Sequence, residues 1–280
     1  MLFGLFGDKK NEAGEMSFLG HLEALRWHLV RSVSVIMVMA VVLFCFKEFL
    51  FDDILLAPKN PNFFTYRAMC AMAHRLNLGD DLCITKIDFN LISTDISAQF
   101  TIHMWVAFVG GLIVGFPYLV WELWRFIKPA LHENEQRYAK GIVFYTSFLF
   151  LTGVLFGYYV ITPMSVNFLG TYQVSTEVKN MISLDSFISI VTTMTLITGV
   201  VFELPIVVYF LTKIGILTPK FMRTYRRHAV VIILTAAAII TPTSDATTLT
   251  LVFIPLYFLY EVSIFVSAYV VKKKDKESRA

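Results

Sequence analysis

Six long apolar segments constrain the fold of this chain more than any other feature. They cover residues 25–46, 98–119, 141–164, 187–211, 229–241 and 248–271. A helix needs about 20 apolar residues to cross roughly 30 Å of hydrocarbon, and in lipid it satisfies its own backbone hydrogen bonds. The composition agrees, because 56% of the residues are hydrophobic and only 16% are charged. The sequence therefore predicts an all-α, polytopic integral membrane protein with six transmembrane helices.

The fifth segment is the shortest of the six. Its apolar core, 229–240, has 12 residues and is closed by Pro242. The following Thr241–Asp245 has the composition of a tight turn. We therefore expect the last two spans to form a hairpin.

The basic residues indicate the orientation. Lysine and arginine number four in Trp121–Lys140, five in Thr212–Arg227 and five in the tail, whereas the second and third loops on the other side hold one and none. Short loops rich in these residues stay in the cytoplasm. Both termini are therefore predicted to be cytoplasmic, with a polar tail at 1–16, the transmembrane domain at 17–271 and a basic tail at 272–280.

Two helical segments carry further patterns. Phe18, Leu22, Leu25 and Leu29 form one apolar helical face, which predicts a short amphipathic helix at the inner surface before the first span. In the second span, the glycines at 110, 111 and 115 predict close approach of a neighbouring helix.

Glu203 is the most unusual residue of the spans. It lies in Phe187–Leu211, which holds no other charged residue, and Pro205 follows two positions later. A carboxylate inside the membrane is costly and usually faces other helices or a wet cavity, while a proline favours a kink. The pattern indicates a helix that handles polar cargo, protons or a polar group of a partner. The alternative is a structural acid satisfied by a neighbouring Ser or Thr.

The first outer loop, Lys47–Ser97, is long enough to have structure of its own. Local helices are expected around Leu55–Pro58 and Tyr66–Leu76. Cys70 and Cys83 are 13 residues apart in this loop. They are expected to form a disulfide or to remain two unpaired thiols, and the sequence leaves both alternatives open. A metal site is not expected, because no second Cys or His pair stands at ligand spacing.

Signatures of soluble enzymes are absent from the chain. It has no Gly-x-Gly-x-x-Gly, phosphate loop, Gly-x-Ser-x-Gly or His-Glu-x-x-His motif. Neither an enzyme activity nor a cofactor, a metal or a nucleic-acid partner is therefore predicted. The remaining signal is a set of acids at the inner face, Glu23 and Glu135, with Glu122 and Glu133 expected in the headgroup zone. Carboxylates bind guanidinium groups through strong paired hydrogen bonds, so such a face suits an arginine-bearing peptide.

Four motifs carry a resemblance to a known family. Ser17–Arg26, Phe126–Leu131, Phe202–Pro205 and Thr241–Asp245 resemble, in this order, the TatC family, over residues 17–271. TatC is the six-span receptor subunit of the twin-arginine protein translocase. The resemblance implies a signal-peptide receptor and core scaffold that exports folded proteins across the bacterial cytoplasmic (inner) membrane with the proton-motive force.

The resemblance also implies partners and site residues. The expected partners are twin-arginine signal peptides, TatA-type and TatB-type single-span proteins, membrane lipid and further copies of the chain. Residue by residue, it places signal-peptide binding at Glu23, Leu25, Arg26, Phe126, Pro129 and Glu135, intramembrane partner docking at Glu203 and Pro205, and outer-loop positions at Pro58 and Asp245.

Two departures from the family pattern affect the site. The second acid of the family's His-Leu-Glu-Glu-Leu-Arg is Ala24 here, and Glu23 lies about 100° around a helix from it. Either Glu23 replaces that acid or Glu135 carries more of the recognition. The turn before Asp245 is also one residue longer, and Leu249 stands where a glutamine is common.

Two other functions remain open. A proton-coupled secondary transporter would use Glu203 as its titrating acid, although no internal repeat supports that architecture. A purely structural scaffold would export normally after Glu203 is replaced.

Overall fold

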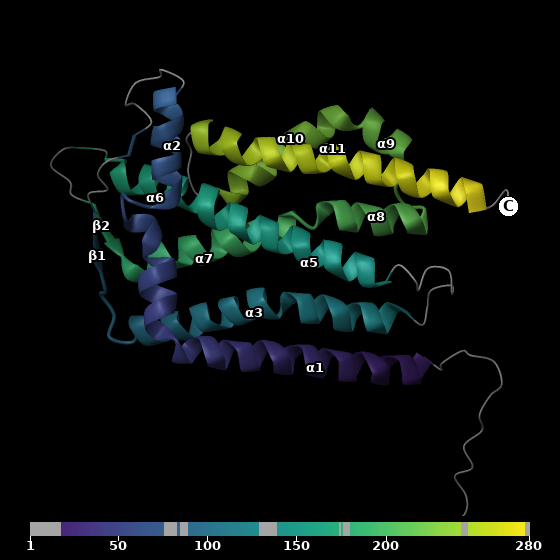
Figure 1. Ribbon diagram of the computed structural model, residues 1–280, viewed down its shortest axis with the longest axis horizontal. Helices are drawn as coiled ribbons and strands as arrows, with labels where there is room; N and C mark the ends of the chain where they lie inside the picture. Colours follow the sequence, from purple (N-terminus) through teal and green to yellow (C-terminus); the bar gives the residue numbers. More distant parts are fainter. Residues whose placement is uncertain are drawn as a thin grey trace, which may run out of the picture.

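The computed structural model describes residues 18–75, 83–84, 89–128, 139–173, 175, 180–241 and 246–277. Its long helices lie side by side in one bundle, with α1 (Phe18–Cys45) along one edge beside α3 (Ala98–Ile127), and α11 (Ala246–Glu277) on the opposite side (Figure 1). Between these edges lie α5 (Ala139–Phe156), α7 (Leu184–Val201) and α8 (Leu204–Ile214). We call the end where α1 begins and α11 ends the terminal end, and the opposite end the loop end.

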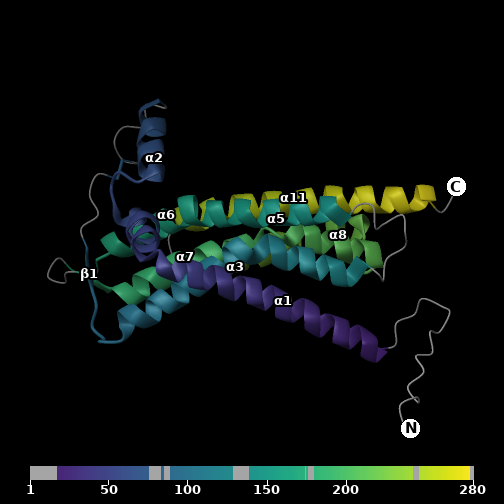
Figure 2. The same cartoon turned by 60° about the horizontal axis from the view of Figure 1, so that its bottom comes forward.

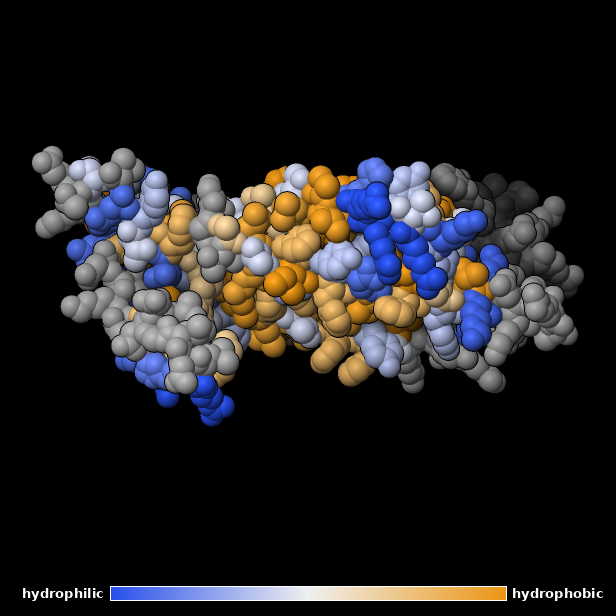
Figure 3. Space-filling view, turned by 90° about the horizontal axis from the view of Figure 1, so that it is seen from above, coloured by the Kyte–Doolittle hydropathy of each residue, from blue (hydrophilic) through white to orange (hydrophobic). Residues whose placement is uncertain are grey.

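Within the described residues, five helical stretches are long and apolar enough to cross a membrane. They are Leu22–Cys45, Ala98–Ile127, Gly141–Thr171, Leu184–Ile214 and Thr248–Lys274. Apolar side chains cover the middle of the molecule, and hydrophilic ones gather toward its ends (Figure 3). The chain is therefore a multi-pass, α-helical membrane protein, as predicted.

The predicted fifth span corresponds to α10 (Arg226–Ile240), which follows the short α9 (Pro219–Thr224). It has 15 residues, or about 22 Å at 1.5 Å per residue, less than the roughly 30 Å of hydrocarbon. Its buried Ala237 packs in one apolar cluster with Val252 and Leu256 of α11. The two helices thus pack as the predicted hairpin, while the turn at 242–245, with Asp245, lies outside the described residues.

Helix α1 runs without a break from Phe18 to Cys45. The amphipathic segment predicted before the first span is therefore the first part of the spanning helix and not a separate surface helix. Leu22, Leu25 and Leu29 are exposed on it.

Close packing of α1 on α3 follows from the glycines of α3. A Cβ atom at Gly111 would lie 2.7 Å from the backbone nitrogen of Ala40 and 2.8 Å from the carbonyl oxygen of Ile36. At Gly115 the nearest atom would be Cγ1 of Ile36, at 3.2 Å. The predicted close approach is confirmed.

Gly111→Ala should destabilise the protein by about 1–3 kcal/mol, because the new methyl group meets backbone atoms that cannot rotate away. The measurement is thermal unfolding of the purified protein in detergent. Gly141→Ala is the matched control, since a Cβ atom there meets nothing within 4 Å. A Gly111→Ala protein that unfolds at the same temperature as the control would contradict the contact.

The kink predicted at Pro205 is confirmed as a break between two helices. Helix α7 ends at Val201 and α8 begins at Leu204, with Phe202 and Glu203 forming the turn between them. Pro205 has no N–H to donate to the preceding turn. The Glu203 nitrogen instead bonds the Val200 carbonyl oxygen at 3.1 Å, a tighter turn than an α-helix makes.

The loop end is covered by the segment that joins α1 to α3. After a π-helix, η1 (Phe49–Leu55), and a short 3-10 helix, η2 (Ala57–Lys59), the chain forms α2 (Phe64–Arg75) outside the bundle (Figure 2). Strand β1 (Asn90–Ile92) then pairs in parallel with β2 (Met181–Ser183). The predicted local helices are confirmed.

Pro58 and Tyr66 hold this cover on the bundle. The buried Tyr66 hydroxyl lies 2.9 Å from the carbonyl oxygen of Pro58 and 3.0 Å from that of Pro163. Pro163 lies in the first turn of α6 (Thr162–Thr171), which continues the α5 span through a π-helix, η4 (Gly157–Ile161). Burial raises the pKa of Tyr66, so its hydroxyl remains a hydrogen-bond donor.

Candidate functional site

A buried acid joins the first two long helices near the terminal end. Glu122 of α3 has no exposed surface, and its carboxylate bonds the Nδ1 atom of His28 on α1. Its Oε1 atom accepts a hydrogen bond from the Tyr118 hydroxyl at 2.9 Å and another from Arg125 at 3.2 Å. A buried carboxylate is costly unless it is paired and hydrogen-bonded, and these three partners satisfy it.

This location corrects the sequence interpretation of Glu122, which placed it in the headgroup zone. The acid points between α1 and α3, where it meets His28. His28 is 94 residues away in the sequence, so the pairing depends on how the two helices pack. A signal was present within α3: Tyr118, Glu122 and Arg125, at spacings of four and three, share one helical face.

Several predicted binding residues lie around this acid. The Phe126 ring, one turn after Glu122, meets the His28 ring edge-on with centroids 6.0 Å apart. Glu23, Leu25 and Arg26 are exposed on the part of α1 that precedes His28. The structure thus brings Phe126 and the start of α1 to the same end of the bundle. Pro129 and Glu135, predicted in the loop after α3, lie outside the described residues.

A second acid lies in the break between α7 and α8. Both carboxyl oxygens of Glu203 are buried, and neither makes a hydrogen bond within the described part of the chain. Pro205 is buried in the first turn of α8. The sequence left open that a neighbouring Ser or Thr forms a hydrogen bond with Glu203. No such hydrogen bond is found among the described residues.

Glu261, another acid of the spans, contrasts with Glu203. Glu261 of α11 bonds Arg226 of α10 at 2.7 Å and accepts a hydrogen bond from the Tyr257 hydroxyl at 3.1 Å. Its side chain is 23% exposed. Glu261 is therefore a paired acid that ties the last two helices together, whereas Glu203 offers unused hydrogen-bonding capacity.

The bundle closes tightly around the break that carries Glu203. A Cβ atom at Gly153 of α5 would lie 2.7 Å from the Cβ of Phe202 and 2.8 Å from the carbonyl oxygen of Thr198. At Gly157, the carbonyl oxygen of Met194 would be 3.0 Å away. These small residues let α5 and η4 approach α7 closely, which fixes the position of the acid.

Metal-ligand side chains come together at the loop end. Among the described residues, the one group whose ligand atoms lie close enough to share a metal ion is Cys70, His74 and Cys83. Cys70 and Cys83 form a disulfide in the structure. Within the same residues, Cys45 is a free cysteine on α1.

Comparison with known proteins gives one family. The family model described as Sec-independent protein translocase protein (TatC) matches residues 20–255. A Sec-independent protein translocase protein TatC of Blattabacterium is 39% identical over 95% of this chain and 100% of its own length. That of Desulforapulum autotrophicum is 33% identical over 95% of this chain and 89% of its own.

Solved structures agree with the sequence comparison. A crystal structure of the twin-arginine translocase receptor TatC has a TM-score of 0.63 and 28% sequence identity, and the match covers 90% of this chain and 99% of that one. A second crystal structure of this receptor, in DDM, has a TM-score of 0.66 and 29% sequence identity. The match covers 88% of this chain and 99% of that one.

Proposed function

The chain belongs to the TatC family of Sec-independent protein translocase proteins, and we propose that it is the signal-peptide receptor and core scaffold of a twin-arginine translocase. It is then a transport component, and no catalytic residue is assigned to it. The observation that supports this role best is the arrangement at the terminal end. The His28–Glu122 bond holds α1 on α3, so that the exposed Glu23 and the partly buried Phe126 lie at one end of the bundle.

We propose six membrane crossings with both ends in the cytoplasm of a bacterial cell. Helix α10 is the short crossing, and it begins with Arg226, which pairs with Glu261, and Arg227, which can extend to the headgroups. The beginning of α1 and the end of α11 lie at the same end of the bundle (Figures 1 and 2), which agrees with an even number of crossings. The protein then resides in the inner membrane, with the terminal end facing the cytoplasm.

Recognition rests on carboxylates that meet the two arginines of the signal peptide. Glu23 on α1 and Glu135 in the loop after α3 supply the acids, with Leu25, Arg26, Phe126 and Pro129 around them. A guanidinium group pairs with a carboxylate through two hydrogen bonds, which an ammonium group cannot reproduce. The peptide should therefore prefer Arg-Arg to Lys-Lys.

The remaining partners bind within the membrane. Glu203, next to Pro205, offers buried oxygens to a polar residue of a TatA-type or TatB-type single-span helix. Further copies of the chain complete the receptor complex, and the proton-motive force supplies the energy, since the sequence has no nucleotide-binding motif.

The experiment that tests the receptor role is photo-crosslinking. A photoreactive amino acid at position 135 should crosslink to a twin-arginine signal peptide and much less to a Lys-Lys version of that peptide. The same probe at position 64, which is at the start of α2 on the loop end, is the control. Equal labelling by both peptides, or from both positions, would reject the assignment.

Glu135→Ala should weaken signal-peptide binding more than Glu23→Ala does. With Ala24 in place of the family's second acid, the acid of the loop after α3 should carry most of the guanidinium pairing. Loss of one charge-assisted contact costs on the order of 1.5–3 kcal/mol, roughly tenfold or more in Kd. Peptide titration of both variants measures this, and a larger loss in Glu23→Ala would transfer the main role to Glu23.

A proton-coupled secondary transporter is the second candidate, and the carboxyl group of Glu203 favours it, because it is buried and makes no hydrogen bond among the described residues. It predicts uptake of a small solute into vesicles that contain the purified protein alone. The receptor role predicts no such uptake.

A further inference from the structure

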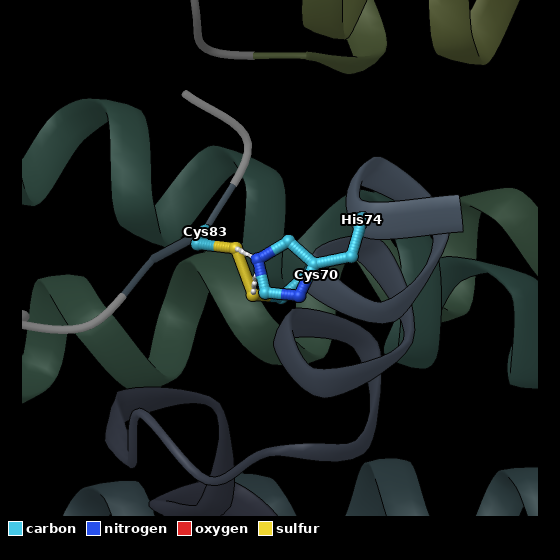
Figure 4. The surroundings of a disulfide bond; sticks show 3 residues. All are labelled: Cys70, His74 and Cys83. Carbon is cyan, nitrogen blue, oxygen red and sulfur yellow. Dashed lines mark hydrogen bonds between the residues drawn. A yellow bond between two sulfur atoms is a disulfide. The ribbon is translucent and has the colours of Figure 1, made fainter. Parts of the chain in front are cut away.

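The disulfide at the loop end has a histidine beside it. Cys70 and His74 are one helical turn apart on α2, and Cys83 lies in the segment before β1. The Nε2 atom of His74 is 3.9 Å from the sulfur of Cys70 and 3.7 Å from that of Cys83 (Figure 4). The imidazole ring thus lies against both sulfur atoms.

These distances resemble the distances between ligands in a tetrahedral metal site. With Zn–S bonds of about 2.3 Å and Zn–N bonds of about 2.0 Å, tetrahedral angles place the nitrogen about 3.5 Å from each sulfur and the two sulfurs about 3.8 Å apart. The distances of 3.9 and 3.7 Å from His74 to the two sulfurs are within about 0.4 Å of that separation. Only the two sulfurs, bonded at about 2 Å in any disulfide, would have to move apart, by about 1.8 Å.

We propose that, when the Cys70–Cys83 disulfide is reduced to two thiols, Cys70, His74 and Cys83 bind a d10 cation that prefers sulfur ligands, such as Zn²⁺. Two thiolates and one imidazole are the ligands that such cations prefer, and the fourth position is left for water or another ligand. His74 is exposed and both cysteines are partly exposed, so a cation from solution can reach them.

Metal binding and disulfide formation exclude each other at this site. Binding of Zn²⁺ forms two Zn–S bonds and one Zn–N bond and releases the two thiol protons. An oxidant of the disulfide class then takes two electrons from the thiolates. The S–S bond of the oxidant breaks, and the oxidant takes two protons from solvent to become two thiols. The Cys70–Cys83 bond forms, and Zn²⁺ leaves.

Either linkage would join α2 to the segment before β1. The cover of the loop end is therefore cross-linked both before and after oxidation, by metal in one state and by sulfur in the other. A single histidine one turn after Cys70 is sufficient for three ligands, so the site has no second Cys or His pair that would mark it in the sequence.

Cobalt(II) binding to the full-length protein in detergent tests the proposal. Cys45 is first replaced by serine, so that Cys70 and Cys83 are the only thiols. After reduction with a phosphine, the protein should bind one more equivalent of Co²⁺ than its oxidised form, with thiolate-to-cobalt charge-transfer and tetrahedral absorption bands. Excess Zn²⁺ should remove these bands, and addition of a disulfide oxidant should release the Zn²⁺ to a chromogenic chelator.

Variants separate this site from other metal-binding groups. His74→Ala should weaken Co²⁺ binding to the reduced protein by at least about tenfold. His228→Ala, which removes an exposed histidine of α10, should leave binding unchanged. Binding that is equal in the reduced and oxidised forms, or in wild type and His74→Ala, would overturn the proposal. These readouts do not depend on signal peptides or export, so they are independent of the proposed receptor role.

Discussion

Glu122→Ala should destabilise the protein by about 3 kcal/mol, one of the two largest effects we expect. The change leaves His28, Tyr118 and Arg125 without their shared acceptor in the contact between α1 and α3. Removal of one partner from a buried ion pair costs about 3–5 kcal/mol, and the lower value applies because Arg125 is 46% exposed. Thermal unfolding in detergent measures the loss.

Two variants show whether the buried network is the cause. Glu122→Gln keeps an acceptor for Tyr118 and the shape of the side chain, so it should lose only about 1 kcal/mol. Glu261→Ala removes an acid whose arginine partner is 46% exposed, so it should cost no more than about 1 kcal/mol. An unfolding temperature of Glu122→Ala equal to that of Glu261→Ala would show that the network does not stabilise the fold.

The same variants test whether Glu122 positions the proposed binding residues. His28 contacts both Glu122 and Phe126, so loss of the acid should loosen the start of α1 against the end of α3. At a temperature where all variants are folded, Glu122→Ala should raise the Kd for a twin-arginine peptide, and Glu122→Gln should restore most of the affinity. Unchanged peptide binding in Glu122→Ala would limit the acid to a structural role.

Local sequence patterns predicted much of the fold. The break before α8 followed from Pro205, the close contact of α1 and α3 from the glycines of α3, and α2 from the composition of the loop. Each of these predictions used a pattern of residues that are near one another in the sequence. Length and hydropathy alone identify five of the six predicted spans, because α10 is too short to meet those criteria.

The missed features depend on contacts between distant residues. Glu122 is buried because α1 places His28 opposite it, and no pattern within α3 gives that register. The three-ligand group depends on a segment that returns to α2 before β1, which brings Cys83 to His74. Pro129, Glu135 and Asp245 stay predictions from the family resemblance.

Glu203→Ala should abolish most export, while signal-peptide binding at the terminal end persists. The alanine removes the only hydrogen-bonding side chain of the break between α7 and α8, where both carboxyl oxygens are buried and unbonded among the described residues. Hydrogen bonds between membrane helices contribute about 0.6–2 kcal/mol, or about 3- to 30-fold in partner affinity. Crosslinking of α8 to a TatA-type or TatB-type helix measures this loss, alongside export of a folded reporter protein.

Glu203→Gln separates hydrogen bonding from charge. Glutamine keeps a donor, an acceptor and nearly the same shape, so a docking role predicts that export and partner crosslinking remain close to wild type. Thr198→Val, five residues earlier, is the matched control, because among the described residues the Thr198 hydroxyl bonds only the Met194 carbonyl oxygen of its own helix, at 2.7 Å. If glutamine proved as damaging as alanine while the control exported normally, hydrogen bonding could not be the cause. A charge or a transferred proton at Glu203 would then be required, and the transporter-like role would replace the docking role.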